Sequence, residues 1–370
     1  MINQDKLRIE IEHKKHQEAE QRKEGMRLDM NFHFYAVKVI ALLSGFDPFE
    51  AIVIADSSQY TDDYFTDEAY ALEGVPAFAR MLMQGDKFKT VPTGFTVMNN
   101  GIGLLQQVNQ KNYIIPFHFI PPYYRRTGHD YKVIRAHLGD KYLINQLLDK
   151  AARSYKESGS DDEKLSGLIR MGITLHIFAD TYAHENFNGY SSDANSARVV
   201  SAKENHRKER THDYAIYNNL PKVGHACVGT APDESCIEFA LEQGAAGEIR
   251  WGRDNTKDFK ECAYEILKYL TEIKRGVSPD NKDQMDAMLD LGFTEASPAK
   301  WENTWENAWE AYRGALPEYH DFHYSRVRFK TCLQPFKSSQ GTLRANPFFY
   351  YYNYNAYLIR ETVKQILTDP

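Results

Sequence analysis

Two histidines and an aspartate follow one another at four-residue intervals inside an apolar stretch of the chain: His176, Asp180 and His184. If this stretch is helical, the three side chains drift across only about 80° of the helix surface and share one face. A carboxylate buried on such a face is costly unless it is paired or bound to a cation. A single buried histidine is usually a hydrogen-bonded core residue, but three such groups in register indicate a metal site.

Other ligands must come from other segments, and four residues lie in surroundings where a polar group needs a partner. His33 lies among aromatic residues at the start of the first apolar segment, and His118 lies in an apolar loop rich in proline. Asp62 falls on the apolar face of an expected helix, and His225 lies in a glycine-flanked loop that can approach a metal closely. Imidazole and carboxylate ligands together suit zinc. With the first motif, these residues could supply a cluster of two or three metal ions.

The order of these residues resembles the zinc-dependent phospholipase C superfamily, which also includes single-strand-specific nucleases, and in particular an uncharacterised bacterial branch of it. The resemblance touches residues 29 to about 275 and is carried by Asn31-Phe32-His33, Gly45-Phe46, Ser58-Gln59-Tyr60-Thr61-Asp62-Asp63, the segment from His176 to His184, and Val223-Gly224-His225-Ala226. It implies an all-helical fold around three zinc ions in a cleft.

Carried over by position, the resemblance implies three sets of ligands. One zinc would be held by Asp62, His118, His176 and Asp180, a second by His33 with Asp180 as a bridge, and a third by His184 and His225. The sequence also departs from the family pattern. The better-known enzymes use their mature N-terminal residue as a ligand, whereas a long charged segment precedes His33 here. They also place the last motif histidine farther from the aspartate, and they have a glutamate four residues after the later histidine, where this chain has Gly229. Either Asp233 replaces that glutamate, or the third metal is missing.

Clustered zinc ions lower the pKa of a bridging water and neutralise the charge of a phosphodiester, so that a metal-bound hydroxide can attack phosphorus. We therefore expect a phospholipase C-like phosphoester hydrolase with Asp62, Asp63 and Asp180 in its catalytic centre. Asp180 would bridge metals, and Asp63 would orient the water or accept its proton. The family and the aromatic content favour a phospholipid substrate and a peripheral contact with a membrane.

Two other classes of protein remain open. An HD-type phosphohydrolase, also helical and metal-dependent, would use an adjacent histidine–aspartate pair, and the chain has His129-Asp130, His212-Asp213 and His320-Asp321 in polar, loop-like segments. Alternatively, the protein is a non-enzymatic interaction protein in which a metal only staples the helices together.

The composition of the chain limits the classes of protein to which it can belong. The chain has 370 residues, 42% of them hydrophobic, and a net charge of -6 that provides no general attraction for nucleic acid. The four cysteines are widely spaced and suggest neither disulfides nor a thiolate zinc site. The sequence has no apolar run near the ~20 residues of a membrane span and no secretory signal, so we expect a cytoplasmic protein or one exported without a recognisable signal.

The elements that must position these residues are predicted to be helices. Residues 1–28 form a charged extension with an unknown protein partner, residues 29–275 the metal-binding catalytic domain, and residues 276–370 a helical, aromatic-rich segment packed on the core. Within the catalytic domain, Asp47, Pro48 and Glu50 form a capping-box signature for the helix that carries Asp62. Apolar spacing predicts a further helix at about residues 257–275.

The segments between the expected helices show no strand alternation of note, so we predict an all-α fold with long irregular loops. Near the C-terminus, Trp301, Trp305 and Trp309 also fall four residues apart. We expect this aromatic stripe to pack into the core, with insertion into a membrane interface or stacking on a substrate as the alternatives.

Overall fold

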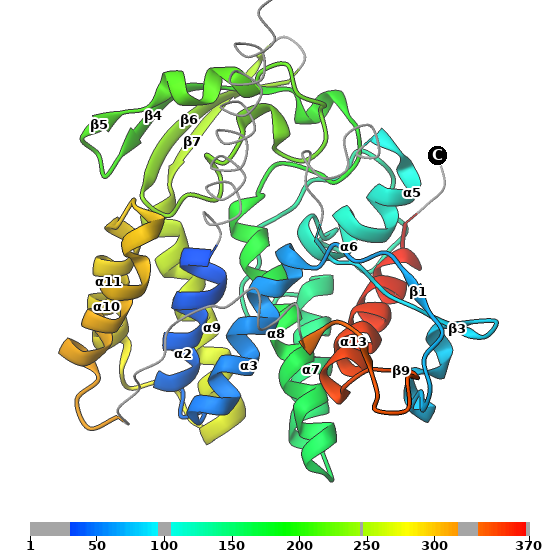
Figure 1. The fold of residues 1–370 in the computed structure, drawn as a ribbon. Helices are drawn as coiled ribbons and strands as arrows, with labels where there is room; N and C mark the ends of the chain where they lie inside the picture. The colour runs from blue at the N-terminus through cyan, green and yellow to red at the C-terminus, as the bar shows by residue number, and fades with distance from the viewer. Residues whose placement is uncertain (1–29, 95–104, 245–246, 317–331, 368–370) are drawn as a thin grey trace, which may run out of the picture.

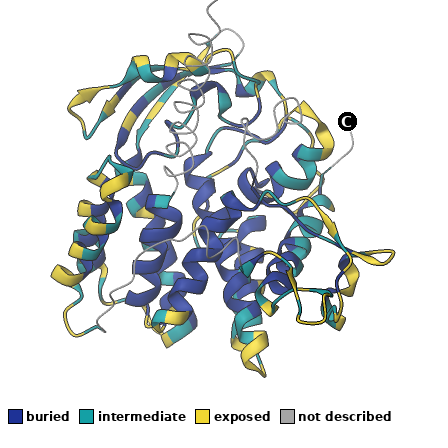
Figure 2. Ribbon diagram, in the orientation of Figure 1, coloured by how far each residue is buried: buried dark blue, intermediate teal, exposed yellow. Residues whose placement is uncertain are grey.

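One long helix, α8 (Asp161–Ala183), runs through the middle of the molecule and is buried along most of its length (Figures 1 and 2). The computed structural model describes residues 30–94, 105–244, 247–316 and 332–367. Ser160 caps α8 by accepting a hydrogen bond from the backbone N–H of Glu163. Because α8 is apolar nearly all round after its first turns, it packs against neighbours on several sides: α3 (Pro48–Asp63), α6 (Ile115–His118), α7 (Leu143–Lys156), α9 (Asn255–Arg275) and α13 (Pro347–Lys364).

The helix α3 begins as the sequence predicts. The Asp47 carboxylate accepts from the backbone N–H of Glu50, and the Glu50 carboxylate accepts in return from the N–H of Asp47. The helix predicted at residues 257–275 is also confirmed, since α9 spans Asn255–Arg275. Before α3, the chain forms the π-helix η1 (Asn31–Ala36) and the α-helix α2 (Val37–Leu43), both fully buried.

Helices α3 and α8 approach each other closely at Gly172. A Cβ atom at this position would lie 2.3 Å from the carbonyl oxygen of Ile54 and 2.6 Å from the Cβ of Ser57. Only glycine fits this approach, and it brings the end of α3, with Asp62, toward the part of α8 that carries His176.

The prediction of an all-α fold is wrong, because the described residues include three antiparallel sheets. The largest has the strand order β5-β4-β6-β7 and lies across one end of the helical layer (Figure 1). Its strands are β4 (Ala197–Glu204), β5 (Lys208–Glu209), β6 (Ile237–Gln243) and β7 (Ile249–Asp254). The smaller sheets have the orders β1-β3-β2 and β8-β9, built from β1 (Ala69–Tyr70), β2 (Met83–Gln84), β3 (Lys87–Lys89), β8 (Phe336–Lys337) and β9 (Leu343–Arg344).

The strand β6 shows what the sequence analysis missed. Ile237, Phe239 and Leu241 are buried and alternate with more exposed residues, as in a strand with one face against a core. These side chains form a second apolar cluster, with residues such as Phe187 and Val223 from the loops that follow α8. The sheet therefore supports the loops at the end of α8.

Short helical turns connect these elements. They are η2 (Ala77–Leu82), α5 (Gln107–Asn109), the π-helix η4 (Gln110–Ile114), η5 (Asp193–Asn195), η6 (Thr211–Tyr217), η7 (Ala226–Val228) and η8 (Pro298–Lys300). Two π-helices thus lie next to predicted metal ligands, η1 around His33 and η4 just before the helix that ends at His118. Such irregular turns are frequent at functional sites.

The C-terminal helices α10 (Lys282–Thr294), α11 (Trp301–Tyr312) and α13 complete the main core. The three tryptophans of α11 are buried, with exposed fractions of 0–3%, which confirms that they pack into the core. Trp305 also donates a hydrogen bond from Nε1 to the side chain of Asn31, two residues before His33. None of the described helices is long and apolar enough to cross a membrane.

Candidate metal centre

The three motif residues of α8 lie at its buried end, beside the loops that the large sheet supports. His176 is 0% exposed, Asp180 3% and His184 6%. His184 does not lie inside the helix, as its spacing suggested, but is the C-cap residue that follows Ala183. Its backbone leaves the helical conformation there, which turns its side chain toward the neighbouring loop.

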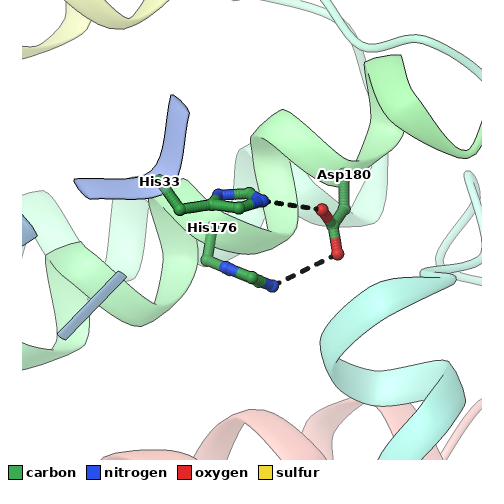
Figure 3. A group of neighbouring side chains, drawn as sticks. All are labelled: His33, His176 and Asp180. Carbon is green, nitrogen blue, oxygen red and sulfur yellow. Dashed lines mark ion pairs between the residues drawn. The ribbon is translucent and has the colours of Figure 1, made fainter. Parts of the chain in front are cut away.

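His33 reaches the same place from the π-helix η1. Its Nε2 atom lies 3.3 Å from Oδ1 of Asp180, and its ring stacks on that of His176 at 3.9 Å between centroids (Figure 3). The Nδ1 atoms of both rings are buried without a hydrogen-bond partner among the described residues. Stacking on each other, rather than a hydrogen bond at Nδ1, therefore orients these two imidazoles.

Asp62 and His118 complete this group from two further helices. Asp62 is the penultimate residue of α3, and His118 is the last residue of α6, not part of a loop as predicted. Oδ1 of Asp62 lies 3.4 Å from Nε2 of His176 and 3.6 Å from Nδ1 of His118. We refer to His33, Asp62, His118, His176 and Asp180 as the inner cluster.

The spacing of the inner cluster fits a metal ion. A tetrahedral zinc about 2.0 Å from nitrogen and oxygen ligands needs these ligand atoms about 3.3 Å apart. His118 Nδ1 lies 3.3 Å from His176 Nε2 and 3.1 Å from Asp180 Oδ2, and the latter two atoms are 3.3 Å apart. With the two distances from Asp62, five separations among four ligand atoms are close to the tetrahedral value. The ligand atoms of Asp62, His118 and His176 could hold one metal ion, and those of His33, His176 and Asp180 form an overlapping group that could hold another.

The hydrogen bonds of His118 show which of its nitrogens faces the cluster as an acceptor. Its Nε2 lies 2.9 Å from the backbone carbonyl oxygen of Thr93. A carbonyl only accepts, so Nε2 carries the hydrogen and a neutral ring presents the lone pair of Nδ1 to the cluster. In turn, the segment of Thr93 is held by α13: Asn353 accepts from the N–H of Val91, and the hydroxyls of Thr93 and Tyr352 are hydrogen-bonded.

His184, His225 and Asp233 form a second group, which we call the loop cluster. Nε2 of His184 lies 3.2 Å from Oδ1 of Asp233, and Nε2 of His225 lies 3.3 Å from Oδ2. Both rings donate from Nδ1 to a backbone carbonyl, that of His118 at 2.6 Å and that of Gly229 at 2.7 Å. When both rings are neutral, their Nε2 lone pairs face the Asp233 carboxylate, an arrangement of acceptors that a cation would hold together. The structure therefore brings Asp233 together with both predicted histidines.

Two residues missed by the sequence analysis fix the loop cluster. The side chain of Arg253, at the end of β7, donates to the backbone carbonyls of Tyr182, Ala183 and Pro232. Asn255 donates to the carbonyls of Ala231 and Glu234, and also accepts from Arg253. Together they join the end of α8, which carries His184, to the loop that carries Asp233.

Comparison with known proteins adds one finding. The model of DUF6765, a family of unknown function, matches residues 28–366. The chain belongs to the DUF6765 family. No curated protein and no solved structure matches it. The match covers both clusters and the C-terminal helices, so the candidate metal ligands of this DUF6765 protein and the helices that support them lie within one family unit.

Burial and charge together set the protonation of the inner cluster. Burial, with the nearby His33, lowers the pKa of His176 to about 3, so this imidazole is neutral at pH 7, as a metal ligand must be. Burial alone would raise the pKa of Asp180, but His176 and His184 hold it well below its ordinary value. Asp180 is therefore a carboxylate at neutral pH.

Charge is also balanced in the loop cluster. Burial alone would lower the pKa of His184, but the carboxylates of Asp180 and Asp233 raise it to about 9. Burial lowers the pKa of His225, whereas the two histidines lower that of Asp233 against the effect of its burial. A positive charge is thus favoured between the two carboxylates, where a bound cation would supply it.

Some predicted residues lie outside the two clusters. Asp63 is buried at the end of α3, next to Asp62, but it is not among the converging ligand atoms of the described residues. Of the histidine–aspartate pairs, His212-Asp213 is on the surface, with 80% of the His212 side chain exposed, and His129 stacks on Tyr190. His320-Asp321 and the charged segment 1–28 fall outside the described residues.

Proposed function

We propose that this protein is a zinc-dependent phosphoester hydrolase with two or three zinc ions, resembling phospholipase C. The observation that supports the proposal best is the close spacing of the ligand atoms of Asp62, His118, His176 and Asp180, which lie 3.1–3.6 Å apart in five pairs. The loop cluster lies beside them, because Nδ1 of His184 is 3.6 Å from Oδ2 of Asp180. Neighbouring cation sites that share carboxylates are typical of enzymes that cleave phosphoesters.

The choice of zinc follows from the ligands. The clusters offer five imidazoles and three carboxylates, and this combination of nitrogen and oxygen donors suits zinc better than magnesium or calcium. Both carboxylate oxygens of Asp180 face imidazoles, Oδ1 toward His33 and Oδ2 toward His118 and His176. Asp180 is therefore the residue that would bridge two ions.

Bound zinc would supply a Lewis acid for the phosphoryl oxygens and lower the pKa of the attacking water. The protein would hold its ligands in place beforehand, through the Thr93 carbonyl at His118 and the Arg253 contacts at the loop cluster. Asp63, beside Asp62, is our candidate for accepting a proton through a small shift of the end of α3.

Exposure of some ligands supports an enzyme over a purely structural metal site. The side chain of Asp62 is 22% exposed and that of His225 is 18% exposed, whereas His176 is completely buried. Each cluster thus has one side that a substrate can approach, and catalytic zinc sites keep such an open position. For the substrate we favour a phospholipid, reached by a peripheral membrane contact, because the net charge of -6 does not attract nucleic acid.

The proposal is tested with the full chain purified without chelator. Elemental analysis should find two or three zinc ions per chain, and a generic phosphodiester such as bis(p-nitrophenyl) phosphate should be hydrolysed. Asp180→Ala should lose turnover and most of the metal together. The control is Asp161→Ala, at the exposed start of the same helix, which should change neither.

Two results would count against the proposal. Less than one tightly bound transition metal per chain would exclude the clusters as metal sites. A full complement of zinc without turnover on any phosphodiester, together with loss of stability in Asp180→Ala, would identify a structural metal site instead.

A further inference from the structure

A cavity of about 220 Å³ lies between α7, α8 and α13, on the side of α8 that faces away from the metal centre. Thr174 lines the cavity and His176 binds in the inner cluster; two residues apart on a helix, they point in nearly opposite directions. Leu147 of α7 and Leu358 and Ile359 of α13 form an apolar wall. No part of the proposed hydrolytic site contributes to this cavity.

Arg170 is the unusual residue of the cavity. It is partly buried, and burial lowers the pKa of its guanidinium group, with only the phenol of Tyr354 acting against this. Among the described residues, no carboxylate lies within ion-pair distance of it. The other partly buried arginines have such partners: Arg135 contacts Asp258 at 2.7 Å, and Arg210 contacts Glu234 at 3.1 Å. A cation removed from water without a counter-charge is unfavourable, so the cavity favours an anion.

We propose that this cavity binds a small organic carboxylate. The planar guanidinium of Arg170 can donate two parallel hydrogen bonds to a carboxylate, and the exposed Lys150 at the rim adds a second positive charge. The leucine and isoleucine wall suits a short alkyl chain rather than the full hydration shell of a dianion.

Two hydroxyl groups complete the polar side. Thr174 and Thr362 line the cavity, and each donates to a carbonyl of its own helix, those of Arg170 and Leu358. Thr174 is completely buried and forms the floor of the cavity, whereas Thr362 is partly exposed. Rotation of the Thr362 hydroxyl can redirect its hydrogen to a ligand oxygen without moving the backbone.

Isothermal titration of the full-length protein with butyrate tests this proposal. We expect saturable binding with a Kd on the order of 1 mM. Arg170→Gln should weaken it about tenfold or more, because a charged hydrogen-bond donor is lost. Leu358→Phe should weaken it as well, by filling the cavity while leaving the charge. The control Arg153→Gln, on the exposed side of α7, should bind like the wild type.

A melting experiment separates binding from general damage. Without butyrate, Arg170→Gln should melt at the same or a higher temperature than the wild type, because it lacks a partly buried charge that has no carboxylate nearby. With butyrate, only the wild type and Arg153→Gln should gain stability. Equal butyrate binding by wild type and Arg170→Gln, or no binding by the wild type, would refute the proposal. Arg170-dependent binding of inorganic phosphate but not butyrate would refute the carboxylate class.

Discussion

At the scale of single residues, Asp180 and Asp233 differ in the number of imidazole rings that their carboxylates contact. Asp180 contacts three imidazoles of the inner cluster through its two oxygens and also approaches His184. Among the described residues, the Asp233 carboxylate forms ion pairs with the two histidines of the loop cluster alone. Substitution of Asp180 should therefore weaken the binding of every metal ion, whereas substitution of Asp233 should weaken the binding of only one.

Asp233→Asn tests this division. The amide keeps the shape of the side chain but removes the negative charge that holds a cation between His184 and His225. We expect elemental analysis to show a loss of about one zinc per chain, with the inner cluster still occupied. Asp193→Asn, on a side chain that is 77% exposed, is the matched control. Loss of all the zinc, or of none, would show that the two clusters are not separate sites.

Residue types and spacing predicted side chains that converge in the structure, because the chemistry of histidine and aspartate lies in their side chains. His33, Asp62, His118, His176 and Asp180 meet in one cluster, although four elements of the chain supply them. Thr93 could not have been found in this way. It orients His118 through its backbone carbonyl, and every residue has one.

At the scale of elements, the inner cluster depends on the distance between α3 and α8. That distance is set at Gly172, one turn before His176, where a methyl group would collide with the backbone of α3. The sequence shows Gly172 only as an ordinary glycine inside a helix. Its role depends on a helix more than a hundred residues earlier in the chain, which helical periodicity does not reveal.

Gly172→Ala should force the two helices apart. We expect a loss of about 1–3 kcal/mol in the free energy of unfolding, as for other overpacked cores, together with weaker zinc binding. Denaturant unfolding and zinc titration measure the two effects. In Gly159→Ala the new methyl group meets only the flexible carboxylate of Glu163, at 3.4 Å, so this variant should behave like the wild type. Normal zinc affinity in Gly172→Ala would mean that the ligands adjust independently of helix spacing.

The strand β7 provides a second test at this scale. Arg253 is 5% exposed and satisfies three buried carbonyls, whereas Arg250, on the same strand, is 71% exposed. Arg253→Met should cost at least about 2 kcal/mol, because buried acceptors lose their donors, and should release the loop-cluster metal first. Arg250→Met should change little. If Arg253→Met binds every metal ion with wild-type affinity, Arg253 stabilises the fold but does not support the metal site.

At the scale of the whole molecule, the all-α expectation failed because the strands are few, short and peripheral. Most helices could be predicted from capping signals and long apolar spacing, as for α3 and α9. The alternation in β6 extends over only seven residues, and β4 has a register shift between Val199 and Ser201 that breaks its pattern. Strand alternation over so few residues is difficult to distinguish from the apolar spacing of a helix.

A buried ion cluster at the far end of the helices should control the acid stability of the molecule. Burial alone would raise the pKa of Glu50, but Lys164, Lys274 and the N–H of Asp47 lower it from 4.5 to about 2. The lowered pKa means that this carboxylate stabilises the folded state above pH 4.5, and that its contribution is lost as the pH falls toward 2.

Glu50→Gln isolates that contribution, because glutamine can still accept the capping hydrogen bond. At pH 7 we expect the variant to be about 1–3 kcal/mol less stable, since both lysines are partly exposed and can be hydrated. The difference should shrink between pH 4.5 and 2. Asp286→Asn, in a surface pair with Lys282, should show almost no difference at any pH. A gap between wild type and Glu50→Gln that stays constant with pH would contradict the assignment.

The contact between α13 and the segment of Thr93 has a consequence for the synthesis of the protein. The candidate metal ligands lie between residues 33 and 233, but the carbonyl that orients His118 belongs to a segment held by Tyr352 and Asn353. A ribosome-bound chain that ends before these residues has every ligand but lacks this support. The finished geometry of the inner cluster therefore arises only after Tyr352 and Asn353 have been synthesised, and a metal ion that meets a shorter nascent chain would encounter a looser site.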